Sequence, residues 1–152
     1  MLLHSPAWQT GDSIPIRYTR RGANLSPPLS WSELPTGTAA LALICTDPDA
    51  SRLWYHWLLW NIPPAWPGLP EHLPRLHEFQ GLGQGMTSYH SLGYDGPDPP
   101  AGETHRYFFR LYALDRPLRL SAGVPGPQLE RAMAGKILAQ AEFKGLFTVI
   151  QA

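Results

Sequence analysis

The stretch GYDGPDPPAGETHRYFFRLYALD, residues 93–115, joins two segments of opposite character. Its first half consists of turn-forming residues, among them Pro97, Pro99 and Pro100. Its second half is rich in aromatic residues, arginine and leucine, a composition typical of a β-strand. His105 lies where the two segments meet. Because a rigid loop that leads into a strand fixes the residue at their junction, the stretch predicts a β fold with a preorganised histidine at a strand end.

The composition predicts one globular domain that spans residues 1–152. Hydrophobic residues make up 43% of the chain and charged residues 16%, which argues against disorder. The 12 basic and 12 acidic residues balance, so no overall field attracts nucleic acid or an anionic membrane. We therefore expect no nucleic-acid partner, and any bound anion must be held by a local site.

The cysteine count and the N-terminus predict the cellular compartment. Cys45 is the only cysteine, so an internal disulfide is impossible. The first residues, MLLHSPAWQTGD, lack the basic and apolar regions of a signal peptide. No apolar run approaches the roughly 20 residues of a membrane-spanning helix. We expect a soluble cytoplasmic protein without integral membrane association.

Six runs with strand character, separated by turn-forming clusters, indicate a mostly β chain. They cover residues 13–19, 29–32, 39–46, 55–62, 106–115 and 145–151. Residues 127–143 have helical periodicity, and the apolar stripe of this helix consists of Leu129, Met133, Ile137 and Leu138. Gly135 interrupts the helix at a cost of about 1 kcal/mol. A weaker helix is expected near residues 71–78.

The two longest runs, 55–62 and 106–115, carry apolar residues on both faces. In the first run, strict alternation places Tyr55 and Trp57 on the same face. Strands that are apolar on both faces lie in the middle of a sheet with a layer packed on either side. The predicted fold class is therefore mostly β: a β-sandwich with one or two peripheral helices.

Residues that can bind a ligand lie at the ends of these strands, beside rigid turns. They are Asp47 and Asp49 in CTDPDAS, His56 in WYHWLLWNIP, and His105 and Tyr107 in PPAGETHRY. Two histidines can each donate an N–H to an anion, while a nearby carboxylate orients one ring and raises its pKa. Pro99, Pro100 and Gly102 would fix the loop and let backbone N–H groups approach the ligand. The constellation predicts a small anion site.

Each of these residues also has a purely structural interpretation. A single histidine at a strand start is more often capped or solvated, and Asp-Pro is a common way to start a turn. The aromatic residues of 55–62 are expected to fill the core before they line a ligand site. Four further histidines have no comparable context and are expected on the surface: His4, His72, His77 and His90.

Several segments, taken in order, resemble those of a known family. They are NLSPPLSWSELPTGTAALAL, TDPDA, YHWLLWNIP, GYDGPDPPAGETHRYFFRLYALD and AEFKGLFTVI. Over nearly the whole chain they resemble the phosphatidylethanolamine-binding proteins, in the compact bacterial branch called Raf kinase inhibitor-like. The resemblance implies a β-sandwich with Greek-key features and a small surface pocket for phosphate-like groups, including phosphoethanolamine and phosphorylated side chains. Because bacterial relatives are often homodimers, a homodimer is expected as one state of the protein.

The resemblance also assigns site residues by position. It places Asp47, His56, His105 and Tyr107 in the pocket and Pro99 and Pro100 at its rim, and it implies neither a cofactor nor a metal ion. It further implies a cis peptide bond between Asp47 and Pro48. Ser51 departs from the pattern, because the family usually has proline there. Regulation of a Raf-type kinase depends on tails and loops that differ here, so this role is not carried over.

The leading hypothesis is non-catalytic binding of phosphate-bearing small ligands, as a modulator or inhibitor of an unidentified partner protein. It is favoured because the sequence has no G-x-S-x-G elbow, no phosphate-binding P-loop and no acidic cluster for magnesium. The alternative is a hydrolase that acts on an ester or phosphoester through an acid–base pair of Asp47 and His56. No activated nucleophile stands beside that pair in the sequence. A metal site of Asp47, His56 and His105 is a third hypothesis, although their spacing is not metal-like. A protein-interaction role that senses a phosphorylated partner is a fourth.

Overall fold

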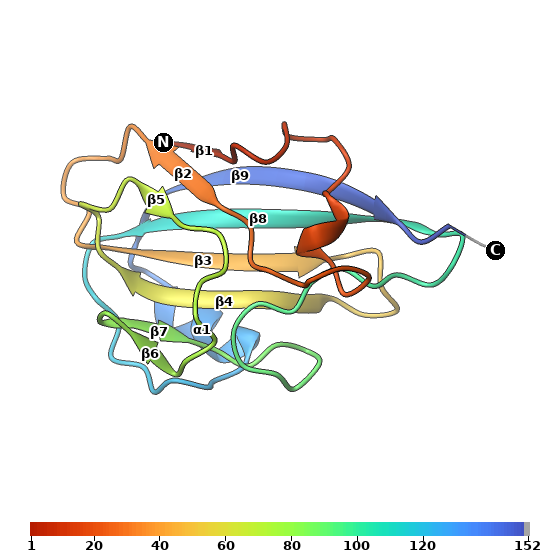
Figure 1. The fold of residues 1–152 in the computed structure, drawn as a ribbon. Coiled ribbons are helices and arrows are strands. Elements are labelled where there is room, and N and C mark those ends of the chain that lie inside the picture. Colours follow the sequence, from red (N-terminus) through yellow and green to blue (C-terminus); the bar gives the residue numbers. More distant parts are fainter. Residues whose placement is uncertain (151–152) are drawn as a thin grey trace.

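The structure is a computed structural model that describes residues 1–150. Within these residues the strands form two antiparallel sheets, and Figure 1 shows the smaller sheet lying across one face of the larger. The smaller sheet has the strand order β1 (Leu2–His4), β2 (Leu29–Ser32), β5 (Gly68–Leu69). The larger sheet has the strand order β6 (Glu78–Phe79), β7 (Leu82–Gln84), β4 (Trp54–Ile62), β3 (Ala40–Asp47), β8 (Thr104–Leu114), β9 (Ile137–Thr148). The predicted mostly β fold is confirmed.

The main hydrophobic core lies between the two sheets. Alternate residues of β8 point into it, as the period of a strand requires. The larger sheet contributes Leu41, Leu43, Trp57, Leu59, Tyr107, Phe109 and Leu111, and the smaller sheet contributes Leu3, Leu29, Trp31 and Leu69. This core forms the floor beneath the strand ends that carry the site.

A second, smaller core covers the opposite face of the larger sheet. The helix α1 (Gly126–Met133) places Leu129 and Met133 against Leu58 and Trp60 of β4. Every residue of β3 is buried, because this strand has a core on each side. The expectation that the two longest strands are covered on both faces is therefore confirmed for β4, whereas the second face of β8, with Phe108 and Arg110, is only half-buried.

The predicted helix over residues 127–143 is correct only as far as Met133. Gly135 has a φ of 79° and ends the helix, since this left-handed conformation is incompatible with an α-helix. The chain then enters β9, which pairs with β8 from Ile137 onward. Ile137 and Leu138 are 43% exposed and extend no helical stripe. The strand predicted at 145–151 begins eight positions earlier than expected, and its residue 151 lies outside the described residues.

Two further expectations are wrong. Residues 13–19 form no regular strand but a short 3₁₀ helix, η1 (Ile16–Tyr18), because Pro15 before it has no backbone N–H to pair. Ser13 alone forms an isolated bridge, with Leu146 of β9. Residues 71–78 form no helix; Pro74 in the middle of the segment would break it, and β6 begins at its end.

Candidate functional site

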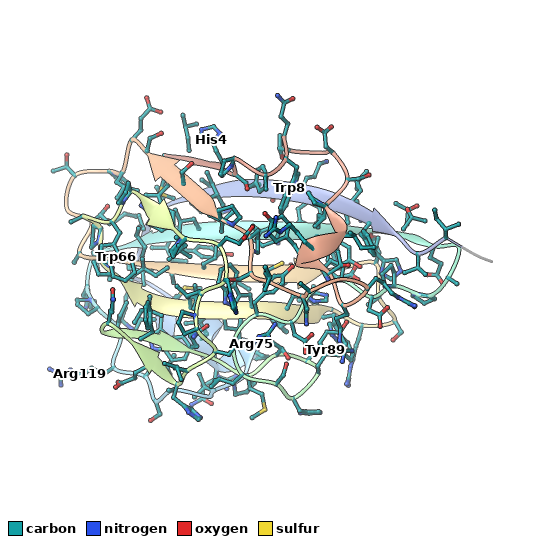
Figure 2. The ribbon with its side chains drawn as sticks, viewed as in Figure 1. His4, Trp8, Trp66, Arg75, Tyr89 and Arg119 are labelled. Atoms are coloured by element: carbon teal, nitrogen blue, oxygen red, sulfur yellow. The ribbon has the colours of Figure 1, made fainter. Side chains whose placement is uncertain are left out.

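The residues singled out in the sequence lie at one end of the larger sheet, where β3 ends and β4 and β8 begin (Figure 1, right). Figure 2 shows Tyr89 at this end of the molecule and Trp66 at the other. A pocket of about 460 Å³ opens here. Its lining includes all six predicted residues, Asp47, His56, Pro99, Pro100, His105 and Tyr107. The topology thus brings three distant parts of the chain to one cavity, while their role as ligand contacts stays a prediction.

His56 occupies a β-bulge in β4. Two consecutive residues of β3 pair with Trp57 and Tyr55, so His56 is an extra residue in β4. A bulge bends the strand and redirects nearby side chains. As a result Trp57 lies in the main core and Tyr55 lies on the α1 side, against the prediction that they share a face. The bulge brings the His56 ring to the pocket, 5.2 Å from the Tyr107 ring centroid.

The backbone fixes the hydrogen of the His56 ring. Its Nδ1 lies 2.6 Å from the carbonyl oxygen of Asp95, and a carbonyl can only accept, so Nδ1 donates. In the neutral ring Nε2 then carries no hydrogen and is an acceptor. Burial lowers the pKa of His56 below its ordinary value, outweighing the Asp95 carbonyl and the charge of Asp47, which raise it. His56 is therefore neutral near neutral pH.

His105 lies between two carboxylates. Its Nδ1 is 2.6 Å from Oδ2 of Asp47, and its Nε2 is 3.0 Å from Oε1 of Glu103. Burial lowers the pKa of His105, but the hydrogen bonds to Glu103 and Asp47 outweigh it, so the pKa lies above its ordinary value. In the protonated ring both nitrogens donate, one to each carboxylate, so the two carboxylates favour the positively charged form of His105.

Aromatic rings form the pocket wall around the two histidines. The Tyr107 ring packs against both His56 and His105, and burial raises the pKa of its hydroxyl, which stays protonated and can donate to an anion. The Tyr89 ring packs edge-on against His56 at 5.6 Å between centroids. The guanidinium of Arg20 lies 4.2 Å above the Tyr89 ring, an attractive cation–π position.

Arginines neutralise two of the acidic groups at the rim. Arg106 donates to both carboxylate oxygens of Asp49, and these hydrogen bonds lower the pKa of Asp49 to about 2. Arg21 donates to Asp98 at 2.8 Å. These ion pairs therefore reduce the electrostatic repulsion between the rim carboxylates and an incoming anion.

The proline-rich loop ends in a tight turn. Glu103 N–H donates to the carbonyl oxygen of Pro100, and Gly102 adopts a φ of 85° that suits glycine at this position. Pro99 is buried and Pro100 is exposed at the rim.

The cis bond implied for Asp47–Pro48 is not found: within residues 1–150 all peptide bonds are trans, the lower-energy form even before proline. In this form the carboxylate of Asp47 accepts the N–H of Asp49.

Several pocket residues were not singled out from the sequence. They are Trp54, Tyr89, Asp98 and Glu103 in the lining, and Asp95 behind His56. Glu103 directly precedes the strand of His105, so its closeness to His105 in the sequence could have identified it as a pocket residue. Tyr89 and Asp95 carried no such signal, because they lie in irregular chain that approaches the pocket only through tertiary contacts. The four other histidines are exposed, as predicted.

The described part of the chain contains neither a cluster of metal-ligating side chains nor a membrane-spanning helix. No three His, Cys, Asp or Glu side chains are arranged there to hold a metal ion. No helix within residues 1–150 is both long enough and apolar enough to cross a membrane.

Comparison with known proteins identifies the family and the fold. The family model for phosphatidylethanolamine-binding protein matches residues 4–148. A UPF0098 protein of Methanothermobacter thermautotrophicus is 47% identical over 149 residues, which cover 97% of this chain and 98% of the relative. The crystal structure of E. coli YbcL, described as a new member of the mammalian PEBP family, has a TM-score of 0.90 at 28% identity and covers 97% of this chain and 98% of its own. CT736 of Chlamydia trachomatis, described as a PEBP homolog, has a TM-score of 0.87 at 38% identity and covers 96% and 95%.

The mostly β fold with two antiparallel sheets is thus of the class that these proteins share. The chain belongs to the phosphatidylethanolamine-binding protein family.

Proposed function

We propose that the protein binds small phosphate-bearing ligands in this pocket without chemical turnover. The supporting observation is the pair of histidines that flanks Tyr107. The carboxylates beside His105 favour its positively charged form, and Tyr107 keeps a hydroxyl that can donate. A third donor arises when His56 takes up a proton on Nε2. Two or three donors around one cavity match the several acceptor oxygens of a phosphate group.

The ligand class includes phosphoethanolamine-like head groups and phosphorylated side chains. A phosphorylated side chain would make the protein a modulator or inhibitor of a partner protein, and this role is part of the proposal. We also propose a cytoplasmic location, which the free, buried thiol of Cys45 supports.

Histidine ring signals followed by NMR during ligand titration test the proposal. Inorganic phosphate, phosphoethanolamine and phosphotyrosine are added at about pH 6 and about pH 7.5, on either side of the ordinary histidine pKa. We expect the signals of His56 and His105 to shift together and saturate, with tighter binding at the lower pH. His56→Ala and His105→Ala should each weaken binding about tenfold or more, as loss of a charge-assisted hydrogen bond implies.

His77→Ala is the matched control, because this histidine is exposed and lies outside the pocket lining. Unchanged affinity in both pocket variants would contradict the proposal. The ranking of the three ligands separates a head-group site from a phosphoprotein site.

The hydrolase alternative remains a separate hypothesis. In the structure the carboxylate of Asp47 is hydrogen-bonded to His105 and the backbone of Asp49, whereas His56 is bonded to Asp95. Turnover of a panel of phosphoesters and carboxylesters, lost in His56→Ala, would favour the hydrolase over the binding module.

A further inference from the structure

The position that an anion needs at His105 is held by a residue of the chain. Glu103 Oε1 lies 3.0 Å from Nε2 of His105, the ring nitrogen on the pocket side. The other ring nitrogen is held by Asp47, whose side chain is only 5% exposed. The side chain of Glu103 is 57% exposed, so it can leave the ring for solvent at little cost. Of the two carboxylates, Glu103 is the one that a ligand can displace.

The loop holds Glu103 in this place. The turn from Pro100 to Glu103 is closed by a backbone hydrogen bond, and Gly102 N–H donates to the carbonyl oxygen of Val149 beyond β9. Thr104 then begins β8, so the backbone on both sides of the Glu103 side chain is fixed. The Glu103 carboxylate can therefore move by side-chain rotation while the backbone beneath it stays fixed at the mouth of the pocket.

The other acidic groups of the rim are already paired with arginines. Asp49 bonds to Arg106 and Asp98 bonds to Arg21. Within the described residues the charged partner of Glu103 is His105. The Tyr107 ring, which stacks on His105, carries no charge at neutral pH, and Asp49, whose charge also acts on His105, is paired with Arg106. The contact between Glu103 and His105 is thus the one that an incoming anion must replace.

We propose that Glu103 is an internal competitor that occupies the anion position of the pocket and sets the affinity threshold for ligands. This inference rests on the proposed function and names the residue that tunes it. Binding is an exchange in which an oxyanion takes the Nε2–H of His105 and the carboxylate of Glu103 moves into solvent. Singly charged carboxylates such as acetate gain little from this exchange, because they offer the same group that they displace. Phosphate monoesters, which carry more charge and more acceptor oxygens, gain more. Glu103 therefore sets a threshold that phosphate-like ligands exceed by more than carboxylates do.

The test compares Glu103→Gln and Glu103→Ala with the parent protein and with Glu78→Gln, which removes an equal charge from an exposed position on β6. Binding of inorganic phosphate and of acetate is measured by NMR on the His105 ring at about pH 7. We expect both Glu103 variants to bind phosphate about two- to fivefold tighter, the range set by one partly exposed ion pair. Acetate, measured by itself, should also bind tighter in Glu103→Ala than in the parent protein by a similar factor, because both anions displace the same carboxylate. Glu78→Gln should match the parent.

The outcomes separate this inference from the proposed function. If the parent binds phosphate and both Glu103 variants bind it equally or more weakly, Glu103 supports the site and the inference is wrong. If acetate binds no more tightly in Glu103→Ala than in the parent, the carboxylate of Glu103 does not occupy the anion position and the inference is wrong. If neither the parent nor the variants bind phosphate, the proposed function itself fails.

Discussion

The Nδ1 atom of His56 lies 2.6 Å from the backbone carbonyl oxygen of Asp95, so this ring presents an acceptor and not a donor to the pocket in its neutral form. An oxyanion is itself an acceptor, and the two repel until a proton comes between them. At the other histidine, His105, the hydrogen bonds to Glu103 and Asp47 raise the pKa and favour the charged ring. The surroundings of the two histidines therefore favour different protonation states before any ligand enters.

The first prediction is that anion binding takes up a proton at His56. Sulfate is the suitable probe, because it does not titrate near neutral pH. We expect uptake of about one proton per bound sulfate at about pH 7.5, since the lowered pKa leaves His56 neutral there. Calorimetry in buffers of different ionisation enthalpy measures the uptake, and His56→Gln should abolish it. Sulfate binding without proton uptake would show that His56 does not donate to the anion.

The second prediction concerns Asp95, whose backbone carbonyl oxygen accepts the hydrogen of His56 Nδ1. Its carboxylate accepts hydrogen bonds from Asn24 and Ser91 and pairs with Arg20, and these contacts hold its carbonyl against the ring. Asp95→Ala leaves the half-buried donors of Asn24 and Ser91 without an acceptor, so we expect a loss of about 1–2 kcal/mol in unfolding free energy. The ¹⁵N shifts of His56 should also show a mixture of tautomers.

Ser91→Ala is the graded control for Asp95→Ala. It removes one of the three contacts and should keep the tautomer. A single Nδ1–H tautomer in folded Asp95→Ala would show that the carboxylate does not position the carbonyl.

Part of the pocket lining, including Asp47, His56 and His105, was predictable from the sequence because strand ends and rigid turns are local features. Asp47 and His105 each border an apolar run, and the pairing of β3 with β8 brings their side chains into contact. The bulge at His56 was not predictable, since an extra residue leaves no trace until the pairing register of β3 and β4 is known. The contact of Glu103 with His105 was not predicted either, because a charged residue directly before a strand is typical of a solvated position.

The chain after the helix shows why propensity alone misplaces an element. The apolar residues of 137–143 fit a helical stripe and a strand equally well. The structure forms the strand because β9 pairs with β8 over almost its whole length, a long-range interaction that local periodicity does not contain. The turn glycine, Gly135, was recognised as an interruption and is in fact the boundary.

The third prediction concerns the pH dependence of stability. The pKa of His105 is raised in the folded protein, so its charged ring adds stability that is fully present below about pH 6.5 and is lost as the pH rises through the folded-state pKa. Asp47→Asn removes a main cause of that shift. We expect the variant to lower Tm more at about pH 5.5 than at about pH 8.5.

Asp115→Asn is the control for Asp47→Asn, because it neutralises an exposed carboxylate that is paired with Arg116 outside the pocket. Its effect on Tm should be similar at the two pH values. An equal loss of Tm at both pH values in Asp47→Asn would mean that the ion pair with His105 does not couple to folding.

The fourth prediction tests whether loop rigidity serves the site. Gly102 and Gly135 both have positive φ, 85° and 79°, but only Gly102 lies in the loop that leads to His105. Alanine at either position is forced into the left-handed region at a cost of about 1–2 kcal/mol, so both variants should lose similar stability. Only Gly102→Ala should also weaken phosphate binding severalfold, because relief of the strain shifts Glu103 and His105 together. Calorimetric binding curves and thermal melts of the two variants separate the effects. If Gly102→Ala loses stability and keeps its affinity, the rigid loop serves the fold and the pocket tolerates movement at its mouth.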